Sequence, residues 1–169
     1  MSPEAALRKA NQDDLPSILK IVTNSVALMN ADNNYQWHES YPLKCDFEKD
    51  IASGTLWVAV IDNTVAGFAA LTTDQTAEYA ELGWKPEDIS LVPHRVAVDP
   101  AFRNKGVARR LMIKAEELAR EEGYKFVRVD TNNHNLAMQG LFKSLGYVFG
   151  GEVVFKHKPA KFGKMFFHC

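Results

Sequence analysis

Apolar residues recur along this chain with two different spacings, which predict helices and strands. An apolar residue every three or four positions predicts a helix, and a run of β-branched and aromatic residues predicts a strand. The predicted helices lie within residues 11–29, 46–52 and 107–122, and in a segment that ends at Gly146. The predicted strands cover residues 7–10, 56–61, 65–71, 89–98, 125–130, 147–156 and 164–168.

The order of these segments predicts the fold class. Strand, helix, helix, three strands, helix, strand, helix and two strands are typical of a mixed α/β (α+β) fold, with about six to seven strands in one central sheet and about four flanking helices. The strand–helix–strand segment 89–130 predicts parallel pairing of its two strands. Since no repeat or long linker interrupts the pattern, we expect one domain over residues 1–169.

Composition and charge narrow the function classes. Of the 169 residues, 46% are hydrophobic and 24% are charged, which suits a packed core. A formal net charge of -1 gives no general attraction for nucleic acid or a membrane surface, so we expect neither as a partner. Cys45 and Cys169 fit neither a disulfide framework nor a metal motif, and no metal is predicted. The N-terminus lacks an apolar signal core, which favours a cytoplasmic protein.

The segment 96–110 carries the most informative pattern. A predicted strand runs into a short loop, and the loop opens a predicted helix. The first N–H groups of such a helix have no partner within it and can hold a phosphate group. Small and basic residues favour an anion there: Gly106, Ala108, Arg103, Lys105, Arg109 and Arg110. A solvated basic turn is the alternative, and the chain has no glycine pattern of the P-loop or dinucleotide-binding type.

Two sequence blocks resemble the GNAT family of acetyltransferases. The family signature Arg/Gln-x-x-Gly-x-Gly/Ala occurs as Arg103-x-x-Gly106-x-Ala108, directly after the strand at residues 94–98. The second block, residues 127–147, has the family's strand, its Asp-Thr and Asn residues, and a helix that ends in a Leu-Gly-Tyr turn. The element order extends the resemblance over essentially the whole chain.

The resemblance implies acetyl-CoA as the co-substrate. Backbone groups of Val96 and Val98 would bind the pantetheine arm and the acetyl carbonyl, in a gap where two central strands splay apart, and Asn135 would contact the pantetheine. The pyrophosphate would lie on Arg103, Asn104, Lys105, Gly106, Val107, Ala108 and Arg109.

The resemblance also implies direct attack of an amine on the thioester, with the backbone N–H of Val96 as the donor to the oxyanion. Phe142 lies at a cofactor position where the family usually has a tyrosine that protonates the thiolate. Either another group donates this proton or the thiolate leaves unassisted, which a thiol pKa of about 8.5 permits. His94 is a candidate general base, because strand alternation gives it the same facing as Val96; a structural histidine is the alternative.

The acceptor is expected to be a primary amine whose identity the sequence leaves open. Aromatic walls with a few polar groups are typical of small-molecule pockets. The candidates for such a pocket are Tyr35, Trp37, Tyr41, Trp57 and Glu78. A place in the core is the alternative for the aromatic residues, and a solvated loop is the alternative for Glu78. A non-catalytic acyl-CoA-binding module is the competing function, and a homodimer is a common state in the family.

Overall fold

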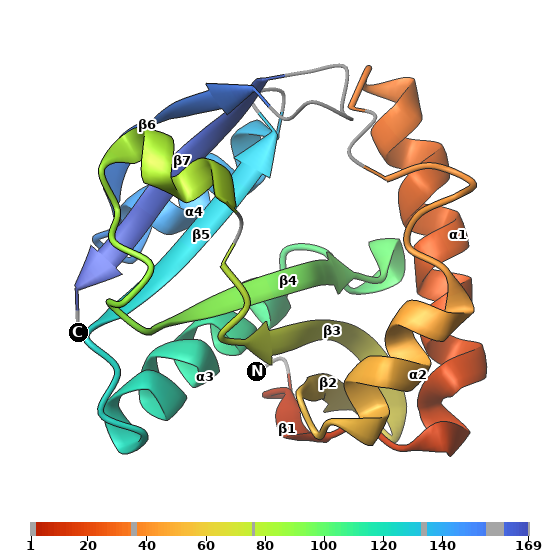
Figure 1. The fold of residues 1–169 in the computed structure, drawn as a ribbon. Coiled ribbons are helices and arrows are strands. Elements are labelled where there is room, and N and C mark those ends of the chain that lie inside the picture. The colour runs from red at the N-terminus through yellow and green to blue at the C-terminus, as the bar shows by residue number, and fades with distance from the viewer. Residues whose placement is uncertain (1–2, 35–36, 76, 133–134, 155–160, 169) are drawn as a thin grey trace.

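The computed structural model describes residues 3–34, 37–75, 77–132, 135–154 and 161–168, with side chains up to residue 152 except that of residue 78 (Figure 1). The strands are β1 (Ala6–Lys9), β2 (Leu56–Ile61), β3 (Thr64–Thr72), β4 (Ser90–Val98), β5 (Phe126–Asn132), β6 (Val148–Val154) and β7 (Lys161–His168). The α-helices are α1 (Leu15–Ala31), α2 (Lys44–Ala52), α3 (Val107–Glu121) and α4 (Leu136–Ser144). Short 3-10 turns are η1 (Gln12–Asp14), η2 (Ala77–Leu82) and η3 (Pro100–Phe102). The strands and α-helices follow each other in the predicted order.

All the strands that the structure describes lie in one sheet, in the order β1-β2-β3-β4-β5-β7-β6. Neighbouring strands are antiparallel except β4 and β5, whose predicted parallel pairing is confirmed. This parallel ladder is short, because it joins only Ser90 to Phe126 and Leu91 to Val127 within the described residues. Beyond Leu91 the two strands diverge, so the sheet opens between its halves (Figure 1). The predicted fold class is confirmed.

Helices cover the sheet in two layers, each with its own apolar cluster. α1 and α2 pack on one face through a cluster that includes Ile18 and Ala97. α3 and α4 pack on the other face through a cluster that includes Leu111 and Phe142, with Val98 against it. In Figure 1, η2 lies in front of β6 and β7, and α4 lies behind them. Because Ala97 and Val98 of β4 pack in different clusters, β4 contributes to both layers.

Close packing of β3, β4 and α3 fixes the start of α3. A Cβ atom at Gly67 would lie 2.7 Å from the carbonyl oxygen of Ala97 and 2.9 Å from Cγ1 of Val107. Such distances are too short for any side chain without a shift of the backbone, so this position favours glycine. The N-terminus of α3 is thereby held at the end of β4, as the predicted strand–loop–helix segment requires.

Some element boundaries differ from the prediction. α2 begins at Lys44 rather than residue 46, because the N–H of Leu43 donates to Oδ2 of Asp46 at 2.7 Å and caps the helix. β7 begins at Lys161 rather than residue 164, because it pairs with both β5 and β6. Residues 155 and 156, predicted as the end of the preceding strand, lie outside the described residues.

Candidate active site

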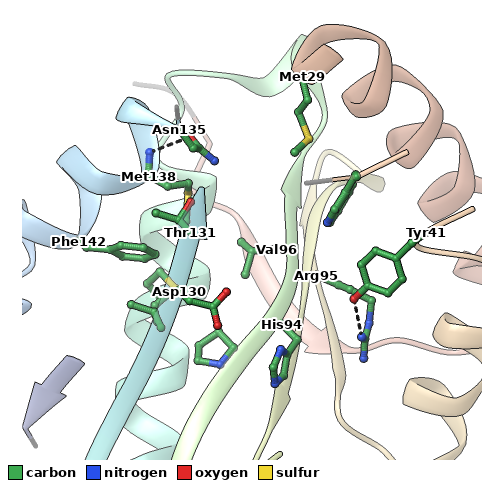
Figure 2. Close-up of a pocket in the computed structure, with 14 residues that line it drawn as sticks. Met29, Tyr41, His94, Arg95, Val96, Asp130, Thr131, Asn135, Met138 and Phe142 are labelled. Carbon is green, nitrogen blue, oxygen red and sulfur yellow. Dashed lines mark hydrogen bonds between the residues drawn. The ribbon is translucent and has the colours of Figure 1, made fainter. Parts of the chain in front are cut away.

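The opening between β4 and β5 forms a pocket (Figure 2). The strands line it with Pro93, His94, Arg95, Val96, Val129, Asp130 and Thr131. α3 and α4 with its N-cap add Met112, Asn135, Met138 and Phe142, and α1 with the segment after it adds Met29, Trp37 and Tyr41. The pocket therefore reaches from α3 and α4 on one side to α1 on the other.

A β-bulge in β4 decides which side chains reach this pocket. Ala70 of β3 lies opposite His94, and Phe68 lies opposite Ala97, so β4 has one extra residue between these pairs. Arg95, within the bulge, has a φ of 50°, in the left-handed region that non-glycine residues rarely adopt. His94 and Val96 both line the pocket, as expected, but Arg95 between them lines it as well, which regular alternation would not allow.

One ring nitrogen of His94 forms a hydrogen bond at the pocket. Its Nε2 lies 2.9 Å from the carbonyl oxygen of Asp74. A carbonyl oxygen only accepts, so Nε2 carries the proton and donates. In the neutral ring this tautomer leaves the lone pair on Nδ1, which is then the atom that can accept a proton.

Arg95 connects the pocket to α2. Its Nε and Nη2 donate to Oδ2 and Oδ1 of Asp50, both at 2.7 Å, and its Nη1 donates to the hydroxyl oxygen of Tyr41 at 3.2 Å (Figure 2). Burial alone lowers the pKa of Arg95, but the hydrogen bonds to Asp50 and Tyr41 outweigh it, and the pKa is raised. Arg95 is therefore a permanent cation, shielded from solvent and matched by a carboxylate.

Asp130 enters the pocket from β5 and contacts the connection between β3 and β4. Tyr79, in η2, donates its hydroxyl to Oδ2 of Asp130 at 2.8 Å. Burial raises the pKa of Tyr79 well above its usual value, and the neighbouring carboxylate raises it further. The hydroxyl of Tyr79 therefore stays protonated and remains a donor.

The loop before α3 has the geometry of an anion site. Gly106 precedes the helix with a φ of 74°, and the N–H of Arg110 donates to its carbonyl at 2.9 Å. The N–H groups of Val107, Ala108 and Arg109 precede this first helical bond, so they have no acceptor within the helix. The residues before them are exposed: Arg103, Asn104, Lys105 and Gly106. Such a helix start can hold a phosphate group.

Phe142 lines the pocket from α4, and Tyr147 packs behind it. The two rings stack, with centroids 5.5 Å apart and planes 11° from parallel. The hydroxyl of Tyr147 lies beside the carboxyl of Glu116 on α3, whose pKa is raised by burial. Tyr147 is buried in the core cluster under α3 and α4 and does not line the pocket within the described part of the chain.

A sequence model of the Acetyltransferase (GNAT) family matches residues 24–147. The chain belongs to the GNAT acetyltransferase family. This is a family of acyltransferases, and acetyl transfer from acetyl-CoA is its general reaction.

Curated relatives match this GNAT chain over part of their length. Human N-acetyltransferase 8B is 37% identical over 60 residues, which are 36% of this chain and 26% of the relative. Human N-acetylaspartate synthetase is 33% identical over 91 residues, which are 54% of this chain and 26% of the relative. The chain thus spans about a quarter of each of these relatives.

Solved GNAT structures match nearly the whole chain. An acetyltransferase of the family from Streptococcus agalactiae has a TM-score of 0.84 and 24% identity, covering 98% of this chain and 95% of that one. The protein yncA from Salmonella typhimurium, solved with acetyl-CoA, has a TM-score of 0.72 and 18% identity, covering 97% and 93%. At these identities the likeness establishes the GNAT fold.

The structure brings part of the expected GNAT site together. Val96, Asn135 and Phe142 line the pocket with His94. Val98 lies after the bulge, opposite Gly67, where it packs towards α3 and does not line the pocket. The expected pyrophosphate loop lies at the start of α3, as required for anion binding.

Two of the expected acceptor residues, Trp37 and Tyr41, line the pocket. Trp37 is only 4% exposed and stacks on Phe68 with centroids 6.4 Å apart, so it also belongs to the core. Tyr35 and the side chain of Glu78 lie outside the described residues.

The prediction for Trp57 is corrected. Its side chain packs against the α3 cluster, and Nζ of Lys114 lies 4.9 Å from the ring centroid. Alternation along β2 turns Trp57 towards α3, because its neighbour Val58 belongs to the cluster under α1. Trp57 therefore does not line the pocket.

Sequence reasoning missed the contacts of Arg95 with Asp50 and of Asp130 with Tyr79. These partners are 45 and 51 residues apart in the chain. Arg95 lies in the strand that precedes the family signature, and this position was the only sequence feature that pointed to it. Asp50 and Tyr79 belong to no motif.

No group of three or more His, Cys, Asp or Glu side chains within the described residues is placed to hold a metal ion. None of the described helices is both long and apolar enough to cross a membrane.

Proposed function

We propose that this protein is an N-acetyltransferase that moves the acetyl group of acetyl-CoA to a primary amine by direct attack in a ternary complex. The observation that carries the proposal is the pocket between β4 and β5. It joins the α3 and α4 side to the aromatic side chains of Trp37 and Tyr41. A cofactor bound from the first side and an amine bound from the second would meet beside Val96.

Acetyl-CoA would lie along β4 with its pyrophosphate at the N-terminus of α3. The N–H groups of that first turn and the helix dipole favour an anion, and Arg103 and Lys105 add positive charge. The side-chain oxygen of Asn135 accepts a hydrogen bond from the N–H of Met138 at 3.2 Å, which fixes the amide (Figure 2). Its NH2 group can then donate to the pantetheine.

The backbone N–H of Val96 would stabilise the oxyanion that forms when the amine attacks the thioester. The bulge leaves Val96 without a register partner on the described β3 and β5 strands. One such donor contributes roughly 3 kcal/mol to the stability of a transition state. Nδ1 of His94 would accept the proton of the amine, directly or through water.

The leaving thiolate would depart without a tyrosine acid from α4, because Phe142 stands at the family's position and Tyr147 packs outside the pocket. Its ordinary pKa of about 8.5 makes it a tolerable leaving group near neutral pH. The names of N-acetyltransferase 8B and N-acetylaspartate synthetase refer to N-acetylation, which supports an amine as the acceptor here.

Thermal unfolding with acetyl-CoA, CoA, NAD and ATP tests the cofactor first. A ligand at about 100 times its Kd stabilises a fold by about 2.7 kcal/mol, so acetyl-CoA and CoA should each raise the Tm by a few degrees while NAD should not. No shift with either CoA species would contradict the proposal. Release of free CoA thiol with a set of primary amines tests transfer, and cofactor binding without release would indicate a binding module instead.

A further inference from the structure

Arg95 has a backbone conformation that its surroundings must hold in place. Its φ of 50° lies in the left-handed region, in the middle of a strand. Arg95 forms the bulge and has no register partner on the described β3 and β5 strands. The same bulge brings Val96 to the pocket beside His94. Contacts from outside the strand must therefore stabilise this turn of the backbone.

The Arg95 side chain makes these contacts with Asp50 and Tyr41, which lie outside the strand. Its guanidinium meets both oxygens of Asp50 at 2.7 Å, in the fork geometry that fixes orientation as well as distance. The two side chains are 16% and 10% exposed, so solvent competes little for these bonds. The remaining nitrogen, Nη1, donates to the hydroxyl oxygen of Tyr41 at 3.2 Å. This bond connects the guanidinium to the side of the pocket that is proposed to hold the amine.

We propose that the Arg95–Asp50 pair is a clamp that holds the bulge of β4 in the geometry that presents the Val96 N–H to the pocket. Arg95 and Asp50 are then positioning residues for acetyl transfer. This inference rests on the proposed function, because Val96 is the proposed oxyanion donor. The clamp joins α2 to β4, so the helix on one face of the sheet controls the shape of the strand at the reacting atoms.

A second ion pair in the chain provides a matched control. Arg8 donates to both oxygens of Asp14, at 2.7 and 2.8 Å, and Asp14 is 6% exposed. This pair ties β1 to the start of α1, and neither residue lines the pocket. Breaking this pair should lower the folding stability and leave the contacts of the bulge unchanged.

The first experiment compares Asp50→Asn with Asp14→Asn, at a temperature well below the unfolding midpoint of both. Both variants should have a lower Tm. Asp50→Asn should also lower kcat about tenfold or more, because a misplaced oxyanion donor loses most of its effect. Asp14→Asn should keep kcat within about twofold of the wild-type value. Equal kcat in the two variants would overturn the clamp and leave a purely structural ion pair.

Two substitutions of Arg95 separate positioning from direct contact with the acceptor. Arg95→Gly and Arg95→Ala both lose the ion pair, but glycine adopts a left-handed φ readily and alanine does not. The clamp therefore predicts that Arg95→Gly retains a kcat about fivefold to tenfold above that of Arg95→Ala. Equal kcat values, with the KM for the amine raised equally in both variants, would mean that Arg95 binds the acceptor and would overturn the proposal.

Hydrogen exchange tests the clamp without any ligand. Peptides that cover residues 93–98 should exchange faster in Asp50→Asn than in the wild type or Asp14→Asn, while peptides from β2 should not differ between the two variants. Unchanged exchange at 93–98 overturns the clamp, whatever the activity. If Asp50→Asn shows faster exchange at 93–98 and the wild-type protein transfers acetyl to no amine, the clamp is supported and only the proposed function is contradicted.

Discussion

His94 and Phe142 show how much of the proposed chemistry depends on single side chains. The Asp74 carbonyl selects the tautomer of His94 in which Nδ1 accepts. Phe142 offers no proton, although the position is one where the family usually has a tyrosine. In the proposed reaction, His94 would take the proton of the amine, and the thiolate would leave without help from position 142. Both identities were readable in the sequence, but the tautomer was not, because Asp74 lies 20 residues away in another segment.

Replacing His94 by alanine tests the base. We expect kcat/KM to fall by about a hundredfold, since a positioned base contributes about 10²-fold or more, and the shape of its dependence on pH to change. Initial rates of CoA release across a series of pH values measure both effects.

His38→Ala is the control for this experiment, because His38 is exposed and does not line the pocket. It should leave the profile unchanged. A profile of His94→Ala that keeps the shape of the wild-type profile would show that another group acts as the base.

At the scale of elements, the start of α3 and the bulge of β4 contrast in how they arise. The strand–loop–helix segment at residues 96–110 is local in the chain, so apolar spacing and a glycine predicted it. The bulge depends on the register with β3 and on Asp50 from α2. Strand alternation therefore describes β4 only up to His94. Beyond His94, the direction of each side chain depends on the register with β3, which the sequence does not show.

Gly67→Ala tests how tightly β3 and β4 hold the start of α3. The new Cβ would meet the carbonyl oxygen of Ala97 at 2.7 Å and Val107 at 2.9 Å. We expect the free energy of unfolding to fall by about 1–3 kcal/mol, as for other overpacked sites. The Kd for acetyl-CoA should also rise, because the anion site at the helix start shifts. Urea unfolding and calorimetry measure the two effects.

Gly140→Ala is the matched control, since a Cβ at this exposed position of α4 would meet nothing within 4 Å. It should raise the free energy of unfolding by up to about 1 kcal/mol through helix propensity and leave the Kd unchanged. Equal behaviour of the two variants would contradict the packing argument.

At the scale of the whole molecule, the pocket lies where the two halves of the sheet are least connected. Within the described residues, β4 and β5 pair only at Ser90–Phe126 and Leu91–Val127. A ligand in this opening would contact both halves and add the connection that the short ladder lacks. Binding and stability should therefore be coupled across the sheet.

Hydrogen exchange with and without acetyl-CoA tests this coupling. We expect slower exchange in β4 at 93–98, in β5 at 129–132 and at the start of α3, because the ligand would bridge these elements. Exchange in β1, at the edge of the sheet, should not change beyond any global stabilisation. Protection confined to residues 103–109 would mean that the cofactor binds at the loop without entering the opening.

The sequence by itself determined the order of the elements, the parallel pairing of β4 and β5, and the strand–loop–helix geometry at the start of α3. The element order and the start of α3 depend on residues close together in the chain, where the spacing of apolar residues and the turn-forming residues set the local backbone. The parallel pairing follows from the strand–helix–strand order of residues 89–130. Only the tertiary structure decided which side chains reach the pocket. It turned Trp57 towards α3, brought Arg95 inwards at a bulge, and joined it to Asp50 across 45 residues. Such contacts depend on strand register and helix packing, which bring together segments that share no pattern in the sequence.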